Sequence, residues 1–215
     1  MMTVTEAMEK RRSIRAFRPT PVEREKLVAI CEAALHTPSW ANSQPWEVYI
    51  ATGETLERIK QGYAESYASH AEQAPETPRP TVWTDAAIKR REELHPDMQR
   101  DCGDAVKQFG KLNQTMFGAP AVMYLCMDKV LSQWSLYDIG AYSQSAMLAA
   151  TALGLGTIPA MTLTLFPDIL HRELSIPENL KVTIGIAIGY EDTENAINYF
   201  KSARVSIEQN VHILD

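Results

Sequence analysis

The chain has 215 residues, of which 45% are hydrophobic and 22% are charged, and this composition predicts one globular domain over residues 1–215 that buries its own core. The formal net charge of -6 argues against a protein that wraps a polyanion such as nucleic acid. Three widely spaced cysteines predict neither a disulfide framework nor a zinc site, and they fit a reducing cytoplasm. The N-terminus lacks the apolar core of a signal peptide, and no apolar run approaches membrane-spanning length.

The first 73 residues are predicted to form three helices and one strand. Thr3 and Glu6 have the spacing of a capping box, which indicates a short helix that delivers the chain to the basic segment beginning at residue 11. Residues 20–23 combine a threonine cap, a proline and an acid, and they predict the start of a second helix that ends before Pro38. A strand over 46–52 and a helix over 54–73 follow.

Residues 74–113 differ from the rest of the chain. Three prolines over 75–80 break regular structure, and residues 85–94 indicate a highly charged, exposed helix. A second helix is predicted over 101–113. Because no independent apolar core is visible here, the segment is interpreted as a helical excursion from the single domain.

The remaining chain mixes helices and strands without regular alternation. The predicted elements are a buried strand over 121–127, a core helix over 136–153, an extended stretch over 157–162, a short helix over 167–174 and a last strand over 182–188. This order favours an α+β sandwich over a doubly wound sheet. The tail over 195–215 has little periodicity, which is typical of an arm held down by another subunit.

A basic segment near the N-terminus is the first candidate for function. It holds four arginines interleaved with small and apolar residues, in the order Arg11, Arg12, Ser13, Ile14, Arg15, Ala16, Phe17 and Arg18. Arginine's planar guanidinium suits phosphate oxygens, and main-chain groups beside Ser13 could add donors. Taken alone, however, the segment favours solvated surface charge over a phosphate site.

A polar stretch at residues 38–46, here called the polar shelf, is the second candidate. It places small neutral polar side chains between two prolines and beside two tryptophans, a composition that ordinary connecting loops rarely need. One interpretation is a solvated turn. The other is a rigid surface for a neutral, hydrogen-bonding ligand, built from Ser39, Asn42, Ser43 and Gln44.

Several chemistries lack support in this sequence. It contains no Gly-x-Gly-x-x-Gly or P-loop motif and no Gly-x-Ser-x-Gly elbow, and its five histidines are scattered without metal-ligand spacing. No acid-base machinery is apparent. This pattern indicates that a cofactor carries the chemistry while the protein supplies position and electrostatics.

Together these segments resemble the nitroreductase family of FMN-dependent NAD(P)H oxidoreductases. The resemblance rests on residues 11–17, residues 38–46, Gly154-Leu155-Gly156-Thr157 leading to Pro159-Ala160-Met161, Ile188-Gly189-Tyr190, and Arg204. It implies an α+β, nitroreductase-like sandwich whose central, mostly antiparallel sheet is flanked by helices. It also implies a homodimer with exchanged C-terminal arms and with FMN at the interface.

The resemblance assigns the cofactor-binding residues. Arg11, Arg12, Ser13 and Arg15 should hold the FMN phosphate, the ribityl chain and part of the ring edge, with Lys201 and Arg204 adding charge at the phosphate. Ser39, Asn42 and Gln44 should reach the flavin held mainly by the other subunit. Pro159, Ala160 and Met161 should pass the flavin ring, with a main-chain N–H of Met161 or Thr162 facing N5. Some members have Glu-Gly where this chain has Met161-Thr162.

The implied activity is electron transfer from NADPH or NADH to nitroaromatic or quinone-like acceptors by a ping-pong mechanism. No catalytic side chain is assigned, because the flavin and water can supply the protons. The alternatives are dehalogenation or enoyl reduction on the same fold, and a non-enzymatic flavin-binding protein. A nucleic-acid-binding module that uses the arginines of residues 11–18 is the least favoured interpretation.

Overall fold

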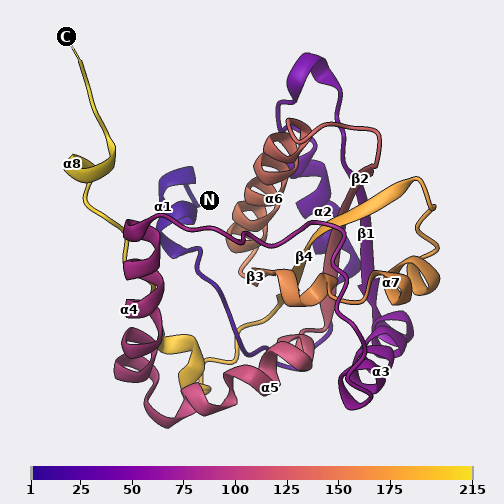
Figure 1. The fold of residues 1–215 in the computed structure, drawn as a ribbon, viewed down its shortest axis with the longest axis horizontal. Helices are drawn as coiled ribbons and strands as arrows, with labels where there is room; N and C mark the ends of the chain where they lie inside the picture. The colour runs from indigo at the N-terminus through magenta and orange to yellow at the C-terminus, as the bar shows by residue number, and fades with distance from the viewer. Residues whose placement is uncertain (1, 215) are drawn as a thin grey trace.

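The computed structural model describes residues 2–214, and Figure 1 shows a central sheet with helices packed around it. The sheet has the strand order β1 (Glu47–Thr52), β2 (Ala121–Asp128), β4 (Leu180–Gly189) and β3 (Gly156–Ala160). Every neighbouring pair of strands is antiparallel. The predicted α+β class and the antiparallel sheet are therefore confirmed.

Two hydrophobic cores lie on opposite faces of the sheet, and β2 contributes to both. Val122, Tyr124 and Cys126 belong to one core, whereas Met123 and Leu125 belong to the other. This division follows from the alternation of side chains along a strand. It explains why residues 121–127 read as a continuous apolar run, since a strand covered on both faces has no polar side.

Four helices cover the two faces. The helices α3 (Gly53–Ala68) and α7 (Pro167–Leu174) contribute to the first core, and α2 (Arg24–Ala34) and α6 (Ser135–Ala152) contribute to the second. Small side chains such as Ala146 and Ala150 on α6 allow the α2 and α6 backbones to approach closely. The predicted core helix is therefore confirmed.

The two N-terminal helices differ in how well local signals predict them. The helix α1 (Val4–Lys10) begins with the predicted capping box between Thr3 and Glu6. The predicted start of α2 is wrong, because the helix begins at Arg24 rather than directly after Thr20. The Arg18 amide donates to the Tyr190 carbonyl (2.9 Å), and the Tyr190 hydroxyl donates to the Glu23 carboxylate (2.6 Å). Contacts with the end of β4 thus override the local cap.

The excursion is more helical than the sequence predicts. The helix α4 (Asp85–Cys102) runs through Pro96 and past its predicted end, and Gly103, with φ of +54°, ends it. The predicted 101–113 helix is therefore split into the 3-10 helix η2 (Gly103–Gln108) and α5 (Phe109–Gln114). A third small core secures these elements to the body and consists of Ala16, Met98, Cys102, Val106, Ile197 and Phe200.

The C-terminal tail leaves the body of the chain. The 3-10 helix η5 (Ala196–Tyr199) still packs against the excursion, but the segment that carries α8 (Ile207–Asn210) extends away from the other elements (Figure 1). The apolar side chains of this arm are exposed, namely those of Ile207, Val211, Ile213 and Leu214.

No helix within residues 2–214 combines the length and the apolar character needed to cross a membrane.

Candidate cofactor site

The basic segment over residues 11–18, here called the arginine segment, lies alongside β3 as an extended chain. The Ile14 amide donates to the Thr157 carbonyl (3.0 Å), and Ser13 forms a parallel bridge with Thr157. Gly156 permits this approach, because a Cβ atom built there would lie 2.6 Å from Cγ1 of Ile14. Gly156, the first residue of β3, therefore makes room for the arginine segment.

Asn198 fixes the middle of the arginine segment, and sequence reasoning missed it. Its side chain is fully buried, and its Oδ1 accepts the main-chain amides of Arg15 (2.7 Å) and Ala16 (3.2 Å). Its Nδ2 donates to the carbonyls of Ala16 (2.8 Å) and Asp192 (2.9 Å). Because these partners lie far apart in sequence, no local pattern could have revealed this role.

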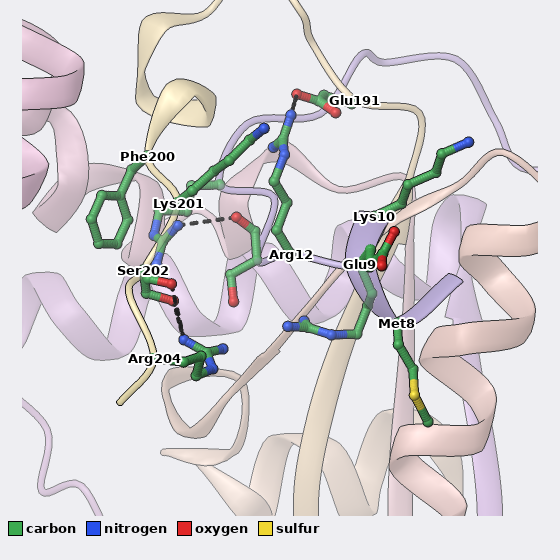
Figure 2. A pocket seen from close by; sticks show the side chains of 12 residues that line it. Met8, Glu9, Lys10, Arg12, Glu191, Phe200, Lys201, Ser202 and Arg204 are labelled. Carbon is green, nitrogen blue, oxygen red and sulfur yellow. Dashed lines mark hydrogen bonds and ion pairs between the residues drawn. The ribbon is translucent and has the colours of Figure 1, made fainter. Parts of the chain in front are cut away.

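The arginines open into a cavity of 620 Å³ between α1, the arginine segment and the start of the C-terminal arm (Figure 2). The cavity brings together six of the predicted cofactor-binding residues, namely Arg11, Arg12, Ser13, Arg15, Lys201 and Arg204. Two carboxylates, those of Glu9 and Glu191, also line it. The side chains therefore create a strongly basic pocket with a limited acidic counterweight.

Arg15 is the most deeply held cation of the pocket. Its guanidinium lies 5.2 Å from the centre of the Phe200 ring, and its Nη1 donates to the Ser13 carbonyl (3.0 Å). Burial lowers the pKa of Arg15, and the nearby charge of Arg12 lowers it further. Its Nε is buried and makes no hydrogen bond within residues 2–214. A desolvated cation with an open donor is the kind of group that an anionic ligand would satisfy.

Arg12, Arg11 and Arg204 are the other arginines that line the cavity. Nη2 of Arg12 forms an ion pair with Glu191 at 2.6 Å, which Figure 2 shows, while its buried Nη1 has no hydrogen-bond partner among the described residues. Burial lowers the pKa of Arg11, and the positive charge of Arg204 adds to the effect. Arg204 itself donates to the Ser202 hydroxyl (2.7 Å) and to nearby carbonyls. These cations stay close together without a full set of carboxylate partners.

The segment predicted to pass the flavin ring, over residues 159–162, follows the part of β3 that contacts the arginine segment. Pro159 and Ala160 lie in β3, beyond the bridge to Ser13, and Met161 and Thr162 begin the 3-10 helix η4 (Met161–Thr164). At about 3.3 Å per strand residue, Ala160 lies roughly 10 Å along β3 from Thr157. The segment is therefore placed so that an elongated ligand could run along β3 from the arginines to η4.

The excursion contacts both ends of this path. The Thr162 hydroxyl donates to Oδ1 of Asn113 (3.1 Å), and Nδ2 of Asn113 donates to the Phe109 carbonyl (2.8 Å). The Phe109 ring in turn lies 6.0 Å from the Arg15 guanidinium. The helix α5 thus links the ring segment to the arginine pocket, and the sequence contained no signal for Asn113.

The polar shelf is folded into a tight, mostly exposed turn around the 3-10 helix η1 (Trp40–Asn42). The Ser39 hydroxyl accepts the Gln44 amide (2.9 Å), and Nε2 of Gln44 donates to Oδ1 of Asn42 (3.1 Å). The three predicted binding residues of the shelf therefore lie together. Their side chains do not line the arginine cavity.

The shelf and the arginine pocket lie near opposite ends of α6. Asp138, in the first turn of α6, accepts the Trp40 amide, whereas Thr151, near the other end, lines a cavity shared with Arg11 and Arg12. Residues 138 and 151 are 13 positions apart, which is about 20 Å along a helix axis. Within one chain, the arginines and the shelf residues therefore form two separate groups.

Comparisons with known proteins identify the family of this chain. The family model described as "Nitroreductase family" matches residues 8–190. The chain is 29% identical to nitroreductase NfnB of Mycolicibacterium smegmatis, covering 93% of this chain and 87% of the relative. It is also 29% identical to a 4-nitrobenzoate reductase of Pseudomonas putida, covering 95% of this chain and 92% of the relative.

Solved structures show the same fold. The FMN- and NADPH-dependent nitroreductase NfnB from Sphigopyxis sp. strain HMH superimposes with a TM-score of 0.91 at 28% identity, covering 99% of both chains. The FMN-dependent NfnB from Mycobacterium smegmatis, solved in complex with NADPH, gives a TM-score of 0.89 at 28% identity, covering 99% of this chain and all of the other. The predictions of a nitroreductase-like fold and of an oxidoreductase are therefore confirmed, and the chain belongs to the nitroreductase family.

Proposed function

We propose that this protein is an FMN-dependent oxidoreductase that takes electrons from NADPH or NADH and reduces nitroaromatic or quinone-like acceptors. The observation that carries the proposal is the half-buried Arg15, which lines a basic cavity beside β3 and whose Nε makes no hydrogen bond among the described residues. Relatives described as nitroreductases, and related structures described as FMN- and NADPH-dependent, support the same reading.

The residues present fit FMN. Arg11, Arg12, Ser13 and Arg15, with Lys201 and Arg204, would hold the phosphate and ribityl chain, because the open donors Arg15 Nε and Arg12 Nη1 need an anionic acceptor. Pro159, Ala160, Met161 and Thr162 would lie beside the flavin ring. FMN, when bound, supplies the chemistry of accepting a hydride and passing two electrons on. The chain's own contribution is to bind, orient and partly desolvate it.

A homodimer would complete the site. In one chain the polar shelf lies about 20 Å along α6 from the arginine pocket, so Ser39, Asn42 and Gln44 would serve the flavin held by the other subunit. The exposed apolar arm that carries α8 would exchange between subunits, because its side chains contact little of their own chain. FMN would then lie at the interface between the two subunits.

The proposed kinetics are ping-pong. The donor and the acceptor would use the same space over the flavin in turn. No protein nucleophile is required, because the cofactor carries the electrons between them. We further propose that residues 1–215 act as one FMN-binding domain, since the third core ties the excursion to the arginine segment. The three free cysteines fit a cytoplasmic location.

The first test is the visible absorption spectrum of the purified protein supplied with FMN. We expect a bound-flavin spectrum that bleaches with NADPH or NADH under anaerobic conditions and recovers on addition of 4-nitrobenzoate or a quinone. Parallel lines in double-reciprocal plots would support ping-pong kinetics. Failure to take up FMN would contradict the proposal. Bound flavin that neither nucleotide reduces would favour a non-enzymatic flavin protein, and preferential turnover of enoyl or halogenated acceptors would favour the other reductive chemistries.

A further inference from the structure

The polar shelf has an unfavourable backbone conformation. Ala41, Asn42 and Gln44 have φ angles of +48°, +57° and +44°, in the left-handed region that residues other than glycine seldom adopt. Asparagine tolerates this region, whereas alanine and glutamine gain nothing from it. Such strain persists only where the surrounding structure holds it in place. Some contact outside the turn must therefore stabilise the shelf.

Asp138 of α6 makes one such contact, at the start of the turn. Its side chain is only 1% exposed, and its two carboxylate oxygens lie 3.2 and 3.4 Å from the Trp40 main-chain nitrogen. Among residues 2–214, the Trp40 amide is the donor found for this carboxylate. A buried carboxylate is costly, and its place in the first turn of α6, near the positive end of the helix dipole, offsets part of that cost.

The contact acts at the start of the strained turn. Trp40 directly precedes the first left-handed residue, so fixing its amide fixes the direction in which Ala41 and Asn42 continue. The Trp40 side chain is held as well, since its ring packs edge-on against Trp134, the residue before α6, at 5.8 Å between centroids. Both rings are exposed, so this packing depends on the anchored backbone rather than on a surrounding core.

We propose that Asp138 is a positioning residue of the flavin site. By holding the Trp40 amide, it keeps Asn42 and Gln44 in the conformation in which their paired amides face outward, as donors and acceptors for the neutral, hydrogen-bonding edge of a flavin ring. Asp138 touches neither cofactor nor substrate and acts through the shelf. The proposal rests on the proposed function for its ligand, but the anchor itself is a property of the chain without cofactor.

The test compares three variants of the full-length protein. Asp138→Ala removes the acceptor together with the buried charge, so no unpaired carboxylate remains and the fold should persist. Asp138→Asn keeps an acceptor oxygen in place. Thr183→Val is the matched control, because it removes another buried hydrogen bond, from the Thr183 hydroxyl to the Leu125 carbonyl (2.7 Å), inside the sheet.

Two readouts are needed. The first is the FMN dissociation constant, measured by quenching of flavin fluorescence, which should rise roughly tenfold in Asp138→Ala and stay within about threefold of the wild type in Asp138→Asn. The second is the near-ultraviolet circular dichroism of the cofactor-free protein, which reports the Trp40–Trp134 pair and should weaken only in Asp138→Ala. Thr183→Val should leave both readouts unchanged.

The outcomes separate the two proposals. Wild-type dichroism in cofactor-free Asp138→Ala would overturn the anchor, whatever the cofactor. An equal loss of FMN affinity in Thr183→Val would also overturn it, because the effect would then reflect general destabilisation. If the wild-type protein binds no FMN, the proposed function fails, while the dichroism of the cofactor-free variants still decides whether Asp138 holds the shelf.

Discussion

The arginine segment and the polar shelf are both short irregular stretches, yet the chain stabilises them differently. The arginine segment is bonded to β3 through Ile14 and to η5 through Asn198, and it opens into a cavity that the same chain closes with Lys201 and Arg204. The shelf is mostly exposed and strained, and its Trp40 amide is held by Asp138 of α6. The difference supports the proposal that one chain completes the phosphate end of the site, whereas the shelf presents its amides to another subunit.

Complementation between two inactive variants gives the largest expected effect. We expect Arg15→Ala and the double variant Asn42→Ala/Gln44→Ala each to lose most FMN-dependent activity. The first variant damages the phosphate end of the site, and the second damages the ring end. If each site combines the arginines of one subunit with the shelf of the other, a mixed dimer contains one intact site. Refolding an equal mixture should then restore about a quarter of wild-type turnover, because half of the dimers are mixed and each has one of two sites intact.

The control for complementation mixes two variants with damage at the same end, such as Arg15→Ala with Arg204→Ala. No mixed dimer of these subunits has an intact site, so turnover should stay at the level of the separate proteins. Recovery in this control, or its absence in the first mixture, would contradict the division of the site between subunits.

Arg15→Ala by itself tests the phosphate end of the site, which we propose one chain completes. A charge-assisted hydrogen bond contributes about 1.5–3 kcal/mol, so the FMN dissociation constant should rise roughly tenfold to a hundredfold. Arg18→Ala is the matched control, since Arg18 is an exposed arginine of the same segment whose side chain donates to the Thr193 hydroxyl (3.3 Å). Fluorescence titration with FMN checks both variants. Equal losses in the two would mean that general positive charge, rather than the pocket, attracts the phosphate.

Asn113→Leu tests the link between the two ends of the path along β3. Without the Asn113 acceptor, the Thr162 hydroxyl loses its partner and the start of η4 should loosen. We expect a several-fold fall in kcat with a smaller change in FMN affinity, since one neutral hydrogen bond contributes about 1 kcal/mol. Thr115→Val is the control, because that hydroxyl bonds only to carbonyls of its own helix within the described residues. Steady-state kinetics with both variants would reveal a difference or exclude it.

Glu76 offers a small pH-dependent effect away from both regions. Burial by itself raises the pKa of Glu76, but hydrogen bonds from the Val182 amide (2.7 Å) and His171 (3.1 Å), with help from Lys129, outweigh it and lower the pKa. A carboxylate with a lowered folded-state pKa stabilises the protein above its unfolded value and loses that effect as the pH falls through the folded value.

Glu76→Gln should therefore unfold more easily than the wild type at neutral pH, by about 1 kcal/mol, because water screens part of the ion pairing. The difference should shrink once the pH falls below 4.5, the ordinary value for a glutamate. Urea unfolding at pH 7 and at pH 4 measures it. FMN affinity at pH 7 should not change, since Glu76 ties the excursion to β4 and α7 rather than to either half of the site.

Local patterns were enough for some parts of the molecule. The capping box at Thr3 and Glu6 and the doubly covered strand over 121–127 depend on neighbouring residues and on strand alternation, and both predictions are confirmed. The start of α2 shows the limit of such reasoning. A cap, a proline and an acid are present at residues 20–23, but hydrogen bonds to Tyr190 keep this stretch extended.

The sequence by itself determined the fold class, the family resemblance and the two candidate segments, because these depend on residue types at short spacing. Only the tertiary structure decided what holds those segments. Asn198, Asn113 and Asp138 act through hydrogen bonds to residues 49 to 183 positions away, and such contacts leave no local periodicity. Only the folded chain, likewise, places the arginines and the shelf near opposite ends of α6, because that separation is set by how the helix packs across the sheet.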